Sequence, residues 1–219
     1  MPLATPFNIL GAPLVELSTI DSTNIYAMAQ IKEGLAKSGS CYRADFQTQG
    51  KGQHGRVWES SAGQNLLCTY ILELKQLDST KKWVPEHQIG FSAAIALGIR
   101  DFYDALTNGD TKIKKPNDIY WRDRKAGGIL IENLVRGTEW TWAVVGIGIN
   151  VNQTQFSPDA PNPVSLKQIT GRDWDIRSLQ KELSNALTAS IKNWLQLGED
   201  ATNKEFEKHI IDLEQKNKQ

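Results

Sequence analysis

The amino-acid sequence predicts an α+β or α/β fold, in which a mixed β-sheet is backed by helices. One observation is the segment 88–106, where apolar residues recur at intervals of 4, 3 and 4 from Ile95 to Leu106, as on one face of a helix. Another is the run 65–74, which is nearly all apolar and therefore typical of a strand buried on both faces. A second amphipathic helix is expected from Ser178 onward. Its apolar stripe comprises Leu179, Leu183, Leu187, Ile191 and Leu195.

The first half of the chain is expected to alternate strands and helices. An apolar strand at 14–17 precedes a helix, whose start is marked by three capping side chains at residues 21–23 and whose end is marked by Gly39. Apolar strands at 41–46 and 65–74 then flank a glycine-rich loop.

The second half is expected to complete the sheet and its helical cover. Residues 153–163 are rich in Pro, Asn, Asp and Ser, so they are predicted to form a surface loop. A polar helix at 201–215 follows the amphipathic helix that begins near Ser178. Four strands are predicted between the helix at 88–106 and that loop, at 111–114, 118–121, 128–135 and 140–150.

The composition is that of a globular protein without overall charge. Basic and acidic residues balance at 25 each, so no global field attracts nucleic acid or an anionic membrane, and there is no room for a helix-turn-helix domain before Val15. Cys41 and Cys68 lie in separate apolar runs and are expected to be buried free thiols. No apolar run approaches the roughly 20 residues of a membrane span, and the N-terminus lacks a signal-peptide layout. The sequence therefore predicts a cytoplasmic protein that binds neither nucleic acid nor membranes.

The stretch from Phe46 to Trp58, FQTQGKGQHGRVW, is the strongest candidate for a ligand-binding loop. Glycine allows positive φ and close approach of a ligand, and exposed N–H groups with cationic side chains bind anions. A solvated hairpin turn is the alternative, but such turns need only about two to five residues. The composition therefore favours a cradle for a phosphate or carboxylate. The loop alternates glycines with cationic or titratable residues, namely Gly50, Lys51, Gly52, His54, Gly55 and Arg56.

Two further polar clusters could complete such a site. In KKPND, Asp118 could hold Mg²⁺ together with a substrate phosphate, or could form an Asx turn with salt-bridge partners, and the sequence leaves both open. Lys125 precedes Ala-Gly-Gly, and this pattern suits a lysine that holds an anionic group. The cluster GIGIN at 146–150 lacks the third glycine and the helix of a dinucleotide fingerprint. The predicted chemistry is therefore anion binding and polarisation.

Together these clusters resemble the biotin protein ligase family. The resemblance runs over residues 14–197 through five ordered motifs: DSTN, QTQGKGQHGRVW, KKPNDIY, RKAGGILIEN and GIGINVN. It implies a catalytic domain like that of class II aminoacyl-tRNA synthetases and biotin ligases over residues 1–200, followed by a helical tail at 201–219. The family's C-terminal SH3-like barrel and an N-terminal DNA-binding domain have no counterpart in these motifs.

The resemblance implies a ligase that works in two steps. The carboxylate of biotin attacks the α-phosphate of MgATP to give biotinyl-5′-AMP, and a lysine of a biotin carboxyl carrier protein domain then displaces AMP. ATP, Mg²⁺ and biotin are the implied cofactors and substrates, and a homodimer is a possible assembly. The implied catalytic residues are Lys125, Lys51 and Arg56. The implied biotin site comprises Ser22, Thr23, Gln47, Gly50, Lys51, Lys125 and Gly128.

The implied nucleotide site lies mainly in the second and third clusters. Asp118 would hold Mg²⁺, and Trp58 and Asn150 would lie near the adenine. The full set comprises Lys51, Arg56, Trp58, Lys114, Asn117, Asp118 and Asn150.

The loop departs from the family pattern, which is commonly GRGRRGR. Lys51, Gln53 and His54 replace three of its usual residues, and lysine cannot bind phosphate through two parallel hydrogen bonds as arginine can. Lys115 stands where the family usually has tryptophan. Two alternatives stay open: a lipoate or octanoate protein ligase or transferase of the same fold, and a non-catalytic biotin-binding relative.

Overall fold

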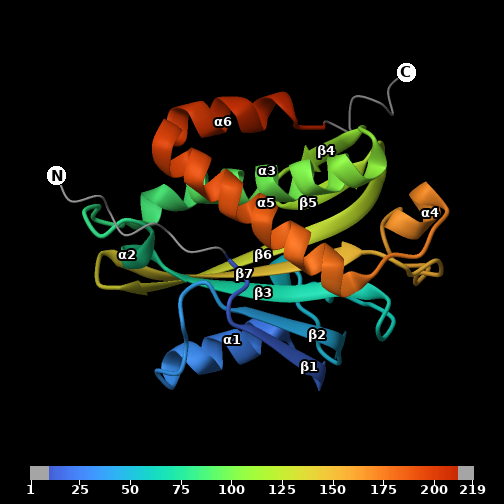
Figure 1. Cartoon of the computed structure of the whole chain (residues 1–219), viewed down its shortest axis with the longest axis horizontal. Coiled ribbons are helices and arrows are strands. Elements are labelled where there is room, and N and C mark those ends of the chain that lie inside the picture. Colours follow the sequence, from blue (N-terminus) through green and yellow to red (C-terminus); the bar gives the residue numbers. More distant parts are fainter. Residues whose placement is uncertain (1–9, 212–219) are drawn as a thin grey trace.

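The computed structural model describes residues 10–211. Its centre is a seven-stranded sheet with the strand order β1-β2-β3-β7-β6-β5-β4 (Figure 1). β1 pairs with β2 in parallel, and the other neighbours pair antiparallel, so the predicted mixed sheet is confirmed. The strands are β1 (Leu14–Ile20), β2 (Cys41–Gln47), β3 (Asn65–Glu73), β4 (Thr111–Lys114), β5 (Asp118–Trp121), β6 (Arg124–Arg136) and β7 (Glu139–Asn150).

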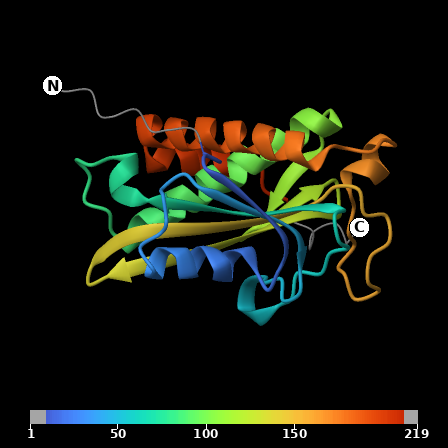
Figure 2. The same cartoon turned by 60° about the horizontal axis from the view of Figure 1, so that its bottom comes forward.

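The helices cover the two faces of the sheet unequally. The long helices α3 and α5 lie on one face, and α1 lies on the other (Figures 1 and 2). The helices are α1 (Thr23–Lys32), α2 (Leu74–Leu77), α3 (Gln88–Thr107), α4 (Leu166–Thr170), α5 (Ile176–Leu197) and α6 (Glu199–Lys208), with 3₁₀ turns η1 (Gln53–Gly55) and η2 (Pro85–His87). None of the helices in residues 10–211 combines the length and the apolar character that a membrane crossing requires.

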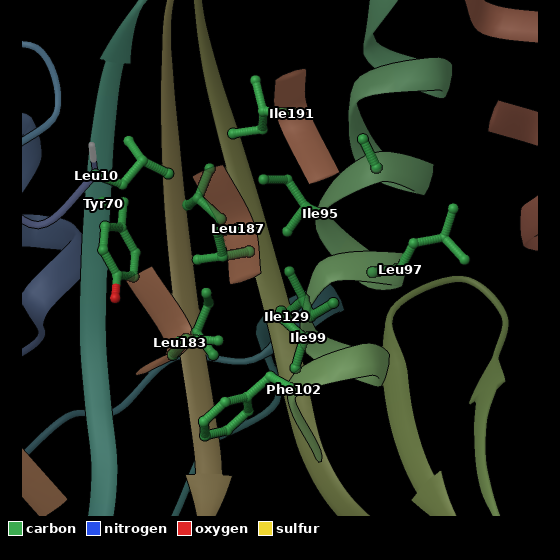
Figure 3. Close-up of a cluster of buried hydrophobic side chains, with 14 of the residues drawn as sticks. Leu10, Tyr70, Ile95, Leu97, Ile99, Phe102, Ile129, Leu183, Leu187 and Ile191 are labelled. Atoms are coloured by element: carbon green, nitrogen blue, oxygen red, sulfur yellow. The ribbon is translucent and has the colours of Figure 1, made fainter. Parts of the chain in front are cut away.

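The two faces of the sheet follow from the period-two alternation of its strands. On β3, the even-numbered Leu66, Cys68, Tyr70 and Leu72 belong to the large core against α3 and α5, whereas Ile71 belongs to a small cluster under α1. Figure 3 shows side chains of α3 and α5 meeting those of the central strands in the large core. The main hydrophobic core therefore occupies one face and leaves the other face free to carry polar groups.

The predicted helices and strands are confirmed, with corrections at their ends. The first helix ends at Lys32, well before Gly39, because the chain turns at Gly34 with a φ of +71°. β7 continues through Gly146 and Gly148, and β6 starts at Arg124, before Gly127 and Gly128. Both glycine motifs are therefore part of a strand and not of a turn. The short helices α2 and α4 were not predicted.

The last helix also differs from its prediction. α6 starts at Glu199 and ends at Lys208, and residues 212–215 of the predicted helix lie outside the described residues. After α6, His209 and Ile211 extend the edge of the sheet: the Ile113 amide donates to the His209 carbonyl at 2.8 Å, and the Ile211 amide donates to the Ile113 carbonyl at 2.9 Å.

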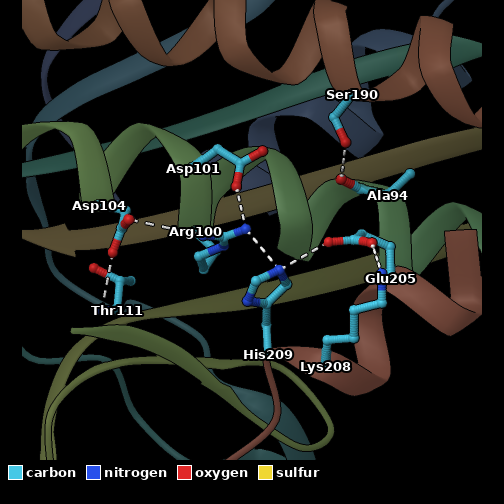
Figure 4. Close-up of polar contacts among 9 residues, drawn as sticks. All are labelled: Ala94, Arg100, Asp101, Asp104, Thr111, Ser190, Glu205, Lys208 and His209. Carbon is cyan, nitrogen blue, oxygen red and sulfur yellow. Dashed lines mark hydrogen bonds and ion pairs between the residues drawn. The ribbon is translucent and has the colours of Figure 1, made fainter. Parts of the chain in front are cut away.

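Side-chain contacts fasten this segment to α3. The Nη2 atom of Arg100 lies 2.8 Å from Nε2 of His209 and 2.8 Å from Oδ1 of Asp101, and Nε2 of His209 lies 3.0 Å from Oε1 of Glu205 (Figure 4). Asp104 accepts from the amide of Thr111 at 3.0 Å, at the start of β4. The β4–β5 hairpin is therefore supported from the side of α3 and α6.

Candidate active site

Three glycines form the floor of a narrow hollow on the sheet face that carries α1. Gly146 and Gly148 are two residues apart on β7, so both face the hollow, and Gly128 on β6 lies beside them. A Cβ atom on Gly146 would overlap Oδ1 of Asn24, and one on Gly148 would lie 2.5 Å from Cε2 of Trp58. The GxG motif therefore clears space on a strand, and it does not form a nucleotide-binding turn.

The N-terminus of α1 forms the polar wall of this hollow, which we call the head pocket. The buried Ser22 is the N-cap residue, although its side chain makes no capping hydrogen bond. The amide and the hydroxyl of Thr23 donate to Oε1 of Gln47 at 2.7 and 3.0 Å. Because a backbone N–H can only donate, the carbonyl oxygen of Gln47 must face Thr23. Nε2 of Gln47 and Oγ of Ser22 have no hydrogen-bond partner within residues 10–211 and are available to a ligand.

A larger cavity of about 650 Å³ adjoins the head pocket, and Gly52 and Trp58 line both. This volume is within the usual range for a small-molecule site. Most of its charged lining comes from the glycine-rich loop and the β4–β5 turn. Its cationic lining residues are Arg56, Lys114, Lys115 and Lys125.

Trp58 and Lys125 lie where the two cavities meet. Nζ of Lys125 is 5.7 Å from the centre of the Trp58 ring and 2.7 Å from Oδ1 of Asp118. The Lys125 and Asp118 side chains are only 19% and 20% exposed, so water screens this ion pair incompletely. The indole Nε1 of Trp58 is buried without a partner in the described residues. The junction thus holds one ammonium group and one unused donor.

Asn150 holds the backbone around this junction. Its Nδ2 donates to the carbonyls of Lys125 at 3.3 Å and Val164 at 3.2 Å. The guanidinium of Arg124 donates to the Pro163 carbonyl at 2.5 Å, and the amide of Val164 donates to the Lys125 carbonyl at 2.8 Å. The start of β6 is therefore tied to the loop that closes the far side of the larger cavity.

The turn between β4 and β5 presents Asp118 as a single carboxylate. Nδ2 of Asn117 donates to the carbonyl of Ile129 at 2.5 Å, which fixes the turn against β6. Within residues 10–211, no group of three or more His, Cys, Asp or Glu residues could hold a metal ion. Burial, and then the charge of Asp118, raise the pKa of Tyr120, so its phenol stays neutral under Nζ of Lys114 at 5.5 Å.

The structure brings nearly all predicted site residues to these two cavities. Gly50 lines neither of them: its carbonyl accepts from the amide of Trp58 at 2.9 Å and so closes the base of the loop. The head pocket receives Ser22, Thr23, Gln47, Lys51, Trp58 and Gly128. The larger cavity receives Arg56, Trp58, Lys114, Asn117, Asp118, Lys125 and Asn150.

Sequence reasoning missed several residues of the site. Asn24 lies in the head pocket beside Gly146 and Gly148, and Phe156 lines the larger cavity from the loop after β7. The GxG spacing could have indicated the floor, because residues two apart on a strand face the same side. Phe156 gave no local signal: it is a single aromatic residue in a polar loop directly after the GIGINVN motif.

Comparison with known proteins finds one family over most of the chain. Residues 16–150 match the model of the biotin/lipoate A/B protein ligase family. The chain is similar to the bifunctional ligase/repressor BirA of Escherichia coli, with 31% identity over 86% of this chain and 56% of that protein. It is also similar to the biotin–[acetyl-CoA-carboxylase] ligase of Mycobacterium tuberculosis, with 29% identity over 79% of this chain and 62% of that protein. The chain thus spans little more than half the length of these relatives.

Solved structures give the same result. The biotin protein ligase of Aquifex aeolicus in complex with biotin and ATP matches with a TM-score of 0.76 and 25% identity, over 91% of this chain and 79% of that one. The biotin protein ligase of Leishmania major with biotinyl-5-AMP matches with a TM-score of 0.74 at 20% identity, which supports the fold alone.

Proposed function

The chain belongs to the biotin/lipoate A/B protein ligase family, and from this premise we propose that it is an ATP-dependent biotin–protein ligase. In the proposed reaction, a carboxylate oxygen of biotin attacks the α-phosphorus of ATP, and pyrophosphate leaves. The ε-amine of a lysine on a biotin carboxyl carrier domain then attacks the acyl carbon of biotinyl-5′-AMP. An amide bond forms, AMP leaves and the amine loses a proton.

The observation that carries this proposal is the pairing of a polar and mainly uncharged pocket with a cationic cavity. The head pocket offers Ser22, Thr23 and Gln47, which suit a polar head group without charge. The larger cavity offers several cations, which suit a triphosphate. Biotin has such a head group at one end and a carboxylate at the other, so its carboxylate would reach the junction at Lys125.

The same pocket argues against lipoate and octanoate as substrates. The dithiolane ring of lipoate and the alkyl chain of octanoate cannot donate a hydrogen bond, and neither offers a strong acceptor. Either would bury Nε2 of Gln47 and Oγ of Ser22 without partners, at a cost of about 1–3 kcal/mol for each unpaired group. A site that is built for hydrogen bonds rejects analogues that lack them more strongly than an apolar pocket rejects an extra methylene.

Lys125 is the residue best placed to assist the first step. Joining a carboxylate to a phosphate brings two anions together, and an ammonium group between them lowers their repulsion. Lys125 would exchange its ion pair with Asp118 for contacts with the substrate carboxylate and then the α-phosphate. Lys51, at the mouth of the head pocket, and Arg56, in the larger cavity, would supply further positive charge.

Asp118 fits a role as one ligand of Mg²⁺. Its carboxylate lines the larger cavity, and Mg²⁺ commonly takes one or two protein carboxylates together with substrate phosphates. When bound, Mg²⁺ would neutralise charge on the triphosphate. In that arrangement the carboxylate would no longer be available to Lys125, which would free the ammonium group for the substrate.

Biotin-dependent exchange of labelled pyrophosphate into ATP tests the proposal. We expect exchange with biotin and none with lipoate or octanoate at the same concentrations. Exchange only with lipoate or octanoate would assign the protein to the other branch of the family. Binding of biotin without exchange would identify a non-catalytic relative. Transfer of labelled biotin to a purified carboxyl carrier domain, with its acceptor lysine replaced by arginine as the control, tests the second step.

A further inference from the structure

A chain of hydrogen bonds continues from the head pocket along the sheet face that α1 covers. The hydroxyl of Thr69 on β3 lies 2.8 Å from Oγ1 of Thr23 and 2.6 Å from Oδ1 of Asn24. Nδ2 of Asn24 donates to Oε2 of Glu132 on β6 at 2.8 Å. Thr69 is fully buried and Asn24 nearly so, which prevents bulk water from replacing these contacts.

Glu132 fixes the orientation of the Asn24 amide. An ionised carboxylate can only accept hydrogen bonds, so the NH₂ group of Asn24 must point to Glu132. The carbonyl of Leu130, 3.4 Å from the same nitrogen, is also only an acceptor. The amide oxygen of Asn24 therefore faces Thr69 and the head pocket.

Counting protons then shows which group the pocket needs. The oxygen atoms form three contacts: Asn24 to Thr69, Thr69 to Thr23, and Thr23 to Gln47. Only two hydroxyl protons are available to them, one from each threonine. The amide oxygens at the two ends attract these protons most strongly, since an amide oxygen is a better acceptor than a hydroxyl. Oγ1 of Thr23 is then left as an acceptor that receives no proton from the protein.

We propose that Glu132 is a positioning residue that, through Asn24 and Thr69, keeps Oγ1 of Thr23 an acceptor for an N–H group of the ligand's head group. The inference rests on the proposed function, because the ring N–H groups of biotin's cyclic urea are such donors. Replacement of Glu132 by glutamine removes the stronger constraint, since two amides can pair in either orientation and only the 3.4 Å contact with the Leu130 carbonyl remains. Asn24 can then turn its NH₂ group toward Thr69, the Thr69 proton moves to Thr23, and the acceptor is occupied.

Calorimetry on the full chain measures the binding of biotin and of its two N-methyl derivatives. In each derivative, a methyl group replaces the hydrogen of one ring N–H. Thr69→Val removes the hydroxyl with little change of shape, and Thr69→Ser retains it. Glu132→Gln removes the orienting charge. Glu139→Gln is the matched control, because Glu139 is a β7 carboxylate whose partner is Lys75 at the surface, 3.2 Å away.

We expect Glu132→Gln to raise the Kd for biotin about tenfold, as for the loss of one hydrogen bond in a buried site. Thr69→Val, Thr69→Ser and Glu139→Gln should bind like the wild type, because none of them places a proton on Oγ1 of Thr23. In the wild type, one N-methyl derivative should bind far more weakly than biotin, and in Glu132→Gln this ratio should shrink. A purely structural role would not change the ratio.

Two results would overturn the inference while leaving the proposed function intact. One is an unchanged affinity for biotin in Glu132→Gln. The other is an equal loss for biotin and its N-methyl derivatives in Glu132→Gln, which would indicate general damage to the pocket. A wild-type chain that does not bind biotin at all would remove the proposed function and this inference with it.

Discussion

Replacing Gly148 by alanine should impair ligand binding more than folding. The added Cβ would lie 2.5, 2.8 and 2.9 Å from Cε2, Cζ2 and Nε1 of Trp58, so the indole must move by about 1 Å to restore ordinary contact distances. Trp58 lies at the end of the glycine-rich loop, and its Nε1 has no partner to lose among the described residues. The indole can therefore move outward, and it would then change the junction of the two cavities.

The size of the effect follows from the cost of overpacking, which is about 1–3 kcal/mol. If this cost appears in the bound state, the Kd for biotin rises about 5- to 150-fold, since about 1.4 kcal/mol corresponds to a factor of ten. Calorimetric titration with biotin measures the affinity, and a thermal melt of the same sample measures the stability.

Gly127→Ala provides the contrast for this experiment. A Cβ on Gly127 would lie 2.9 Å from the backbone oxygen of Gly148 on the neighbouring strand, which cannot move without disturbing the sheet. Its cost should therefore appear as a lower melting temperature, by about 2–4 °C for each kcal/mol in a chain of this size. The reasoning fails if Gly148→Ala binds biotin like the wild type. It also fails if both variants lose the same stability.

Three further predictions concern charge and protonation. Lys125→Ala should abolish pyrophosphate exchange and leave the melting temperature unchanged, whereas Lys125→Arg should retain part of the exchange activity. A wild-type exchange rate in the alanine variant would contradict the role assigned to Lys125. Asp118→Asn should weaken the dependence of exchange on Mg²⁺ and strengthen binding of metal-free ATP, because it releases Lys125; an unchanged Mg²⁺ titration would contradict this. The hydrogen bond with Cys41 and burial raise the pKa of the Cys68 thiol well above its usual range. The folded state therefore favours the neutral thiol, and this contribution to the free energy of unfolding is complete below about pH 9 and is lost as pH rises further. Urea titrations should show a falling free energy of unfolding above pH 9, and Cys68 should resist alkylation in the folded chain.

The elements that the sequence predicted well are those with a strong local pattern. The stripe of α3 and the apolar run of β3 each match one buried face, so periodicity alone indicated them. The errors occur where tertiary context overrides local preference. Glycines at 127–128 and at 146 and 148 weaken strand propensity, yet pairing on both sides keeps β6 and β7 extended through them.

The site was predictable only where its residues form motifs. The glycine-rich loop, KKPND and RKAGG were indicated by composition, and the fold brings them to two adjoining cavities. The network behind the head pocket was not indicated, because Thr69 and Glu132 lie 45 or more positions from their partners on α1. A single polar residue in a strand is usually interpreted as solvent-facing, and the sequence does not indicate that a helix covers it.

The division of the sheet into two faces also limits what the unusual loop can change. β6 and β7 each contribute residues to the α3–α5 core and to the head pocket, so the floor of the pocket is held by a well-buried part of the fold. Lys51, Gln53 and His54 belong to the loop, and although Lys51 lines the head pocket, none of the three takes part in the hydrogen bonds among Thr23, Asn24, Gln47, Thr69 and Glu132. Replacement of the family's arginines at these positions should therefore leave recognition of the head group intact and weaken the hold on the nucleotide or adenylate. Since Lys114 and Lys125 come from other elements, part of the positive charge around the phosphates does not depend on the loop.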